Sequence, residues 1–372
     1  MTTVSDLIYL ITCVINGITP DAERMERISQ NLEELYQLAA FHQVTALAAA
    51  ALSRGGIRDK QFMNALAISA WRESVMGKEL ERVEEAFEKA GIWHMTLKGF
   101  VLKECYPGPG LRQMSDIDLL IDPAGEAASD EIMASLGFNR KDDPGHDFEN
   151  HGMYVKEPVS CFEIHWKLMG KKTLYQEGYS YYDEIEDRLL TDESDPLVRY
   201  FSEEDFYLYM IAHEYKHYNF GGTGLRSLVD TYVYLKKKRK ELDGSYIRRE
   251  AGKMGISDFE KNNRQLAMKV FAPGGYDSLT KEEKEQLIYY ISSGTYGVIN
   301  HVAANKARNM GRRKFLWSRF FPPMSAVKKQ YPVFYKYKIL LPFLPFYRIF
   351  THSGRVKYEI DALKKHNKKG TP

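Results

Sequence analysis

Two aspartates lie two positions apart inside an apolar run of the sequence. Asp116 and Asp118 alternate with isoleucine in the stretch Ser115-Asp116-Ile117-Asp118-Leu119. Because residues i and i+2 of a strand point to the same side of a sheet, we expect the two carboxylates to converge on one divalent cation. Mg²⁺ prefers oxygen ligands and commonly shares its coordination shell with substrate phosphates. The pair therefore predicts phosphoryl or nucleotidyl transfer, with a strand edge or a turn as the structural alternative.

A glycine turn lies upstream of these acids. Lys98 and Gly99 stand between an expected strand at 93–97 and a short expected helix at 100–105. Glycine permits close approach of the backbone to a phosphate, and the N-terminus of the following helix presents free N–H groups to an anion. Lys98 adds a positive charge at the same place. The turn is therefore a candidate for binding the phosphates of a substrate.

A third carboxylate, Glu163, stands on a later expected strand at 161–166. His165 has the same strand parity as Glu163, so both side chains are expected on one face of the sheet. His165 either supports the carboxylates or is a hydrogen-bonded histidine of the core. Three acids on two strands beside a basic glycine turn favour a functional site over a purely structural one.

The elements that must position these residues form a small unit at 91–168. Short apolar runs alternate there with turn signals, which is typical of strands and short helices. The strands are expected at 93–97, 117–121, 153–155 and 161–166, and the helices at 100–105 and 126–136. The unit therefore combines strands and helices within fewer than 80 residues.

Helical periodicity flanks this unit on both sides. Apolar residues recur at helical spacing in region 1–90, and again within region 169–300 after a polar, tyrosine-rich connector that ends near Pro196. Region 301–372 is basic, aromatic and proline-containing. The predicted fold class is therefore α+β, with a small mixed-sheet core at 91–168 between N-terminal and C-terminal helical regions.

Three motifs together resemble a known family. They are Leu-Lys-Gly at 97–99, Arg-x₃-Asp-Ile-Asp-Leu-Leu-Ile at 112–121 and Glu-Ile-His-Trp at 163–166. This set is similar to the bacterial family of uncharacterised nucleotidyltransferases and, more widely, to the nucleotidyltransferase superfamily with the DNA polymerase β-like fold. The wider superfamily has serine or glycine after the turn glycine, where this chain has Phe100. The resemblance covers residues 92–168.

The resemblance implies a Mg²⁺-dependent transfer of a nucleoside monophosphate from a nucleoside triphosphate to an acceptor hydroxyl, with release of pyrophosphate. Three carboxylates would act as metal ligands and catalytic groups: Asp116, Asp118 and Glu163. Three further residues would bind the triphosphate: Lys98, Gly99 and Arg112. Pairing of Arg112 with Asp116 is the alternative for that arginine. The nucleotide and the acceptor, which is a sugar, a metabolite, an RNA or a protein, are not specified by the sequence.

A general base would come from the helical region that follows the core. Asp230 and His213 are the two candidates, because helical domains of related transferases close over the acceptor. Asp230 also lies one turn beyond Arg226, and an ion pair between residues i and i+4 is its structural alternative.

The sequence His-Glu-Tyr-Lys-His at 213–217 matches the short pattern HExxH. In zinc hydrolases the two histidines of this pattern bind the metal and the glutamate is the base, which is here Glu214. No third ligand is evident, and the histidines share a helix face with Phe206, Tyr209 and Met210. A zinc hydrolase therefore ranks below a nucleotidyltransferase.

Charge is distributed unevenly along the chain. The net charge is only +2, yet residues 306–369 hold 17 Lys and Arg against two acids, a net +15. A basic tail with interspersed aromatics predicts peripheral contact with an anionic membrane, and RNA or simple solvation are the alternatives.

Composition limits the remaining classes. With 372 residues, of which 44% are hydrophobic, the chain is long enough for two or three packed units. The three cysteines are far apart and the first twenty residues hold no Lys or Arg, so we expect a cytoplasmic protein without a secretory signal. A non-catalytic module that binds a nucleotide or nucleic acid on the same fold is the alternative of a different class.

Overall fold

The structure is a computed structural model that describes residues 2–141, 150–170, 175–183, 185–295, 324, 327, 331–344 and 347. The chain divides into two compact units. The first comprises Met1–Lys216 and Gly224–Ile291, and the second comprises His217–Thr223 and Ser292–Pro372. The sheet and the predicted metal-binding and phosphate-binding residues of the nucleotidyltransferase site belong to the first unit, whereas His217 of the His-Glu-Tyr-Lys-His motif belongs to the second.

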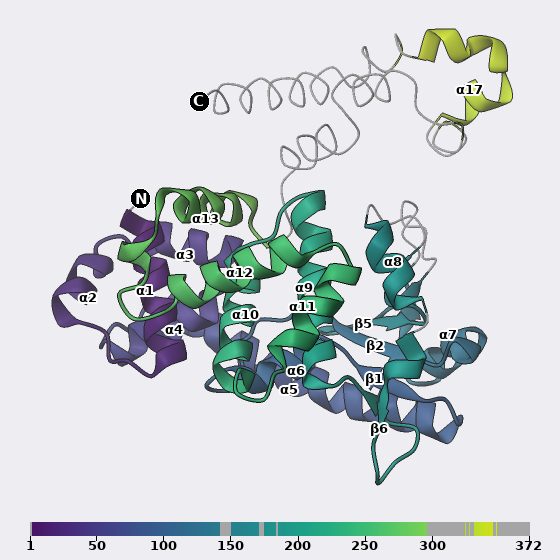
Figure 1. Cartoon of the computed structure of the whole chain (residues 1–372), viewed down its shortest axis with the longest axis horizontal. Helices are drawn as coiled ribbons and strands as arrows, with labels where there is room; N and C mark the ends of the chain where they lie inside the picture. The colour runs from purple at the N-terminus through teal and green to yellow at the C-terminus, as the bar shows by residue number, and fades with distance from the viewer. Residues whose placement is uncertain are drawn as a thin grey trace. The chain divides into compact units, whose positions relative to one another are not determined.

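The first unit contains a five-stranded mixed sheet with strand order β1-β2-β5-β4-β3. Its strands are β1 (His94–Thr96), β2 (Ile117–Ile121), β3 (Asn139–Arg140), β4 (His151–Lys156) and β5 (Ser160–His165). Figure 1 labels strands β1, β2 and β5 on the side of the unit away from the N-terminal helices. Strands β2 and β5 pair in parallel, and the other neighbours are antiparallel. The α+β class with a small mixed sheet flanked by helices is thereby confirmed.

The interior strand β2 is buried on both faces. Its residues Ile117, Leu119 and Ile121 pack into one hydrophobic cluster with Val83 and Phe87 of helix α5 (Lys60–Lys89), and Met133 of α7 (Glu126–Ser135) belongs to the same cluster. Leu120 points to the opposite face, where it joins a cluster that includes Tyr209 of α9 (Glu203–Phe220). Because side chains alternate along a strand, Asp118 lies on the α9 side with Leu120.

The N-terminal and C-terminal helices of the first unit pack together. The first four are α1 (Thr2–Asn16), α2 (Ala22–Ser29), α3 (Leu32–Phe41) and α4 (Thr45–Arg54). The later ones are α10 (Leu225–Lys238), α11 (Gly244–Lys253), α12 (Ser257–Val270) and α13 (Lys281–Ser293), whose last two residues fall in the second unit. At the end of α1, Asn16 donates through Nδ2 to the carbonyl of Phe271 at 2.9 Å and accepts from the Tyr232 hydroxyl at 2.6 Å. Regions that are far apart in the sequence therefore share one helical layer.

Most element boundaries lie close to the expected ones. The strand predicted at 117–121 is β2, and the helix predicted at 126–136 is α7. The short helix after the glycine turn is α6 (Gly99–Leu102), followed by a 3₁₀ turn, η1 (Lys103–Cys105).

The connector that precedes α9 contains more structure than its polar sequence indicates. Helix α8 (Gln176–Tyr182) and the 3₁₀ turn η3 (Ile185–Arg188) are followed by a two-stranded sheet, β6 (Leu190–Thr191) and β7 (Arg199–Tyr200). Tyr175 and Tyr182 belong to the same hydrophobic cluster as Tyr209. The tyrosines of the connector are therefore core residues that hold it against α9.

The second unit is described only in part. It contains α17 (Pro332–Lys336) and the 3₁₀ helix η5 (Lys338–Phe343), with large exposed apolar side chains at Val333, Tyr337, Ile339 and Phe343. Most of the basic tail predicted from Lys306 onward lies outside the described residues. Within the described part of the chain, no helix has both the length and the apolar character needed to cross a bilayer.

Candidate active site

The parallel pairing of β2 and β5 places two predicted metal ligands side by side. Asp118 and Glu163 are Cα partners in this pairing, so their side chains leave the same face of the sheet from adjacent strands. His165 lies two residues farther along β5, and its Nε2 is 3.1 Å from Asp118 Oδ1 and 3.4 Å from Glu163 Oε2. One potential ligand atom from each of these three residues lies within 4.8 Å of the others. The structure therefore resolves the open question of His165, which contacts the carboxylates.

Lys98 approaches the same cluster from the glycine turn. Its Nζ donates to Asp118 Oδ1 at 2.8 Å, and its backbone has a positive φ of 39°, which non-glycine residues seldom adopt. Burial alone would raise the pKa of Asp118, but the Lys98 ammonium and the His165 ring hold it well below its usual range. Asp118 is therefore a permanently ionised carboxylate whose counter-charge comes from Lys98.

Asp116 stands directly before β2, beside the cluster. Burial and the negative charges of Asp118 and Glu163 raise the pKa of Asp116, which places the three acids in one electrostatic environment. Asp116 is not one of the three residues whose ligand atoms lie within 4.8 Å of one another. In this structure the predicted triad consists of two adjacent carboxylates and a third beside them, with His165 in the tightest group.

Two histidines line the β4–β5 side of the cluster. The rings of His151 and His165 lie 4.9 Å apart between centroids. Burial lowers the pKa of His165, but hydrogen bonding to Asp118 and Glu163 outweighs it and raises the pKa above its usual value. Burial and the nearby His165 lower the pKa of His151 to about 4. Hydrogen bonding to the two carboxylates therefore favours the protonated form of His165, whereas His151 is neutral at neutral pH.

Gly99 follows Lys98 and has no room for a side chain. A Cβ atom built on Gly99 would lie 2.9 Å from Arg112 Nη1 and 3.1 Å from Met114 Sδ. The guanidinium of Arg112 therefore packs directly on the turn that we expect to approach the phosphates.

Arg112 has a different partner from those considered in the sequence. Its Nε donates to Asp230 Oδ1 at 2.8 Å and its Nη2 donates to Asp230 Oδ2 at 2.9 Å. The Tyr106 hydroxyl donates to Oδ1 as well, at 2.7 Å. Asp230 is thus paired with Arg112 across 118 residues of sequence, and neither the Arg112–Asp116 pair nor the Arg226–Asp230 pair is found. A buried arginine selects a buried carboxylate because the two planar groups form two parallel hydrogen bonds.

Arg226 contacts Gln113 and Gln43 and forms no ion pair with Asp230 in the described part of the chain. Its Nη1 donates to the Gln113 carbonyl at 2.9 Å and also contacts Oε1 of Gln43. Burial and the nearby charge of Arg112 lower the pKa of Arg226. Arg226 thus brings a positive charge, paired only with neutral acceptors among the described residues, to the side of the cluster where Asp116 lies.

The glutamate of the His-Glu-Tyr-Lys-His motif is engaged in the helical layer. Glu214 accepts from Asn263 Nδ2 at 2.8 Å and from the Tyr290 hydroxyl at 3.0 Å. Burial raises the pKa of Glu214 to about 7. No second group of three close metal-ligating side chains is found in the described ranges, so this motif lacks the third ligand and the available glutamate of a zinc hydrolase.

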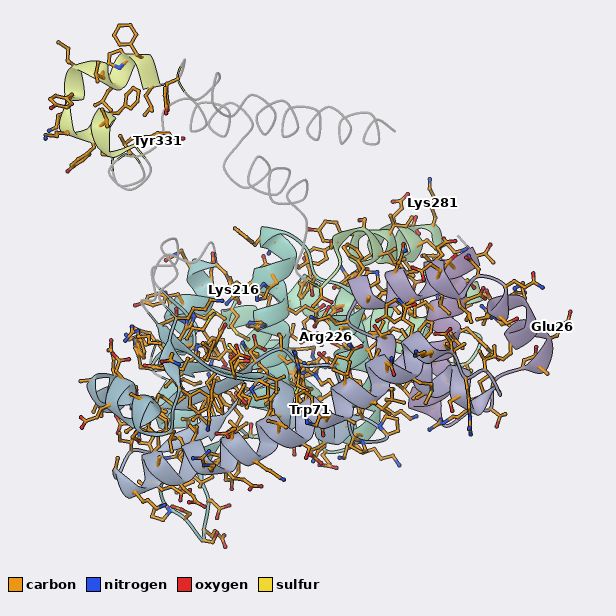
Figure 2. The ribbon with its side chains drawn as sticks, turned by 180° about the vertical axis from the view of Figure 1, so that it is seen from behind. Glu26, Trp71, Lys216, Arg226, Lys281 and Tyr331 are labelled. Atoms are coloured by element: carbon orange, nitrogen blue, oxygen red, sulfur yellow. The ribbon has the colours of Figure 1, made fainter. Side chains whose placement is uncertain are left out.

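The same motif contains a residue that the sequence did not single out. Lys216 lies half-buried on α9 (Figure 2). Burial and the nearby Lys98 charge lower its pKa to about 8, while Asp118 and Glu163 oppose that change. Tyr209 lies two helical turns earlier, and its hydroxyl interacts with Lys98. The spacing of seven residues between Tyr209 and Lys216 was the available signal, because it places both on one helix face.

These elements define a class of protein: a small mixed sheet whose adjacent parallel strands carry clustered carboxylates beside a lysine–glycine turn, surrounded by helices. The sequence model of the family described as uncharacterised nucleotidyltransferase matches residues 29–272. Because this match spans more than half of the chain, the protein belongs to that family. No curated protein and no solved structure matches the chain.

Proposed function

We propose that the protein is a Mg²⁺-dependent nucleotidyltransferase of the DNA polymerase β-like superfamily. It would move a nucleoside monophosphate from a nucleoside triphosphate to an acceptor hydroxyl and release pyrophosphate. The observation that carries this proposal is the register of β2 and β5, which sets Asp118 beside Glu163 on the face toward α9. Membership of the nucleotidyltransferase family supports it.

The donor atoms of this cluster fit a divalent cation. Asp118 and Glu163 offer carboxylate oxygens, His165 offers a nitrogen, and Asp116 stands beside them. In the structure Lys98 supplies positive charge to these acids, and His165 lies within hydrogen-bonding distance of Asp118 and Glu163. When bound by Asp116, Asp118 and Glu163, Mg²⁺ would neutralise charge on the phosphates and on the reacting oxygens.

The residues around the cluster would orient the substrates. The turn at Gly99 would approach the β- and γ-phosphates, with Lys98 close by. Arg112 would support this turn through Nη1 while its other nitrogens hold Asp230. Of the two candidate bases, Asp230 already accepts three hydrogen bonds, which leaves His213 of α9 as the candidate for taking the proton of the acceptor hydroxyl.

The direct test is a screen of the purified protein with Mg²⁺, labelled nucleoside triphosphates and candidate acceptors, with pyrophosphate release as the readout. We expect release that requires both Mg²⁺ and an acceptor and that is lost in Asp118→Asn. Binding of a triphosphate without any release across the acceptor panel would favour the alternative of a non-catalytic nucleotide-binding module.

We also propose a cytoplasmic location with peripheral contact at an anionic membrane through the C-terminal region. Ile339 is 83% exposed and Phe343 63% exposed, next to Lys336 and Lys338, a combination that suits the bilayer interface. Sedimentation of the whole protein with phosphatidylcholine vesicles, with and without phosphatidylglycerol, tests this. We expect binding only to the anionic vesicles, weakened in Ile339→Asp; no sedimentation at low salt would contradict the proposal.

A further inference from the structure

One face of α9 is directed at the carboxylate cluster. Tyr209 is fully buried in the hydrophobic layer between α9 and the sheet, in the same cluster as Leu120 of β2. Its hydroxyl interacts with Lys98, Asp118 and Glu163. Lys216 follows seven residues later, so its side chain leaves the helix on nearly the same side, two turns farther along. Helix α9 therefore carries a lysine to the cluster from outside the sheet.

The charges that act on Lys216 agree with its place on the helix face of Tyr209. Its ammonium group interacts with Asp118 on β2, Glu163 on β5 and Lys98 at the glycine turn, and it also acts on His151 of β4. Strands β2, β5 and β4 are neighbours in the sheet, and Lys98 is hydrogen-bonded to Asp118. Lys216 therefore lies on the side of α9 that faces the cluster.

The cations of the site differ in what already holds them. Lys98 is hydrogen-bonded to Asp118, and Arg112 is paired with both oxygens of Asp230. Lys216 has no hydrogen bond or salt bridge with any residue that the structure describes, although it is half-buried. A half-buried ammonium group without a partner carries a desolvation penalty, which an anion bound beside it would offset. Because Lys98 and Arg112 already have carboxylate partners, Lys216 is the cation of these three that is available for a substrate.

We propose that Lys216 binds the polyphosphate chain of the incoming nucleoside triphosphate, opposite the glycine turn. The inference rests on the proposed function and adds a phosphate ligand from the helical layer to a site whose other residues come from the sheet. A compact ammonium on a flexible stem suits phosphate oxygens, which accept charge-assisted hydrogen bonds. The phosphates would also offset the repulsion between the charges of Lys216 and Lys98.

The test measures binding directly, by calorimetric titration of the whole protein with inorganic tripolyphosphate and with α,β-methylene analogues of ATP, GTP, CTP and UTP in Mg²⁺. The variants are Lys216→Met, which keeps the apolar stem, and Lys216→Arg, which keeps the charge. Lys281→Met is the matched control, because Lys281 is an exposed residue of α13 that Figure 2 shows well away from Lys216. Circular dichroism monitors the fold of each variant.

We expect Lys216→Met to weaken tripolyphosphate and analogue binding by about tenfold or more, Lys216→Arg to retain most of the affinity and Lys281→Met to match the wild type. In turnover assays, Lys216→Met should raise KM for the triphosphate more than it lowers kcat. Wild-type affinity in a folded Lys216→Met variant would overturn this inference and leave the proposed function standing. Failure of the wild-type protein to bind any of these probes would overturn both.

Discussion

Two buried carboxylate clusters of this protein differ in the charge of their neighbours. At the sheet, Asp118 and Glu163 face the ammonium of Lys98 and the ring of His165. In the helical layer, Glu214 faces neutral donors, the Asn263 amide and the Tyr290 and Ser227 hydroxyls. Burial raises the pKa of every one of these acids, yet the pKa values of Asp118 and Glu163 are lowered overall while that of Glu214 rises to about 7.

The difference shows what keeps a buried acid ionised. Neutral donors offset part of the desolvation penalty, whereas a nearby cation offsets more than all of it. An acid that must bind a metal or an anionic substrate complex at neutral pH therefore needs a nearby cation. Glu214 has only neutral donors around it, which makes it a structural residue that gains or loses a proton near neutrality.

The largest effect is expected at the sheet cluster. Asp118→Asn removes the carboxylate charge to which Lys98 and His165 are hydrogen-bonded, so pyrophosphate release should fall by about a thousandfold or more. The variant should also lose about 3 kcal/mol of stability, because the buried Lys98 ammonium loses its hydrogen-bonded counter-ion. Turnover and urea unfolding are the measurements, with the exposed Asp258→Asn as control. Turnover near the wild-type rate would remove Asp118 from the mechanism.

The second largest effect is expected at the ion pair of Arg112 and Asp230, which joins the core to α10. Arg112→Met and Asp230→Leu should each destabilise the protein by about 3 kcal/mol, since each leaves one buried charge alone. The double variant should cost clearly less than the sum, because no unpaired charge remains. Urea denaturation of the four proteins in this cycle measures the coupling. Additive costs would mean that the bidentate contact contributes no coupling energy.

The helical cluster makes a prediction about pH. Because the pKa of Glu214 is raised from 4.5 to about 7 in the folded state, protonated Glu214 stabilises the fold fully below pH 4.5, and this contribution disappears as the pH rises through 7. Glu214→Gln stays neutral, so it should match the wild type near pH 4.5 and be about 3 kcal/mol more stable at pH 8.5. Unfolding free energies measured across this range, with exposed Glu282→Gln as control, decide it. A constant difference at all pH values would contradict the raised pKa.

The smallest effect is expected at the turn. A methyl group on Gly99 would meet Arg112 Nη1, which cannot withdraw freely because Asp230 holds the guanidinium. Gly99→Ala should therefore lower the free energy of unfolding by about 1 kcal/mol and weaken triphosphate binding. Gly77→Ala on α5 is the control, because its Cβ would meet only Phe100 at an ordinary 3.8 Å. Equal behaviour of the two alanine variants would show that the turn tolerates a side chain.

Local patterns predicted the sheet better than the contacts around it. The alternation of isoleucine with Asp116 and Asp118 identified β2. It also correctly indicated that the side chains of Asp118 and Ile117 lie on opposite faces of the sheet. That Glu163 becomes the register partner of Asp118 depends on the parallel pairing of β5 with β2, which a single sequence does not encode locally. Metal binding by these residues stays a prediction.

Long-range partners were beyond the reach of sequence spacing. The spacing of Arg226 and Asp230 favours a pair within one helix, but Asp230 meets Arg112 instead, because tertiary packing offers it a bidentate partner in a buried setting. Lys216 was visible only as part of a metal-binding pattern. Its position at the sheet depends on how α9 packs, which is decided by the connector tyrosines and by the hydrophobic layer over Leu120.

The contact between Arg112 and Asp230 limits how this protein can be dissected or recombined. A fragment confined to the strands at 91–168 would carry Arg112 without its counter-ion, and the guanidinium would then pull away from Gly99 or draw water into the turn. The smallest autonomous piece must therefore continue through α10. If helical regions are exchanged between family members, the turn should be preserved only when the new helical region supplies an aspartate at the position of Asp230. We therefore expect Arg112 and Asp230 to occur together in the family.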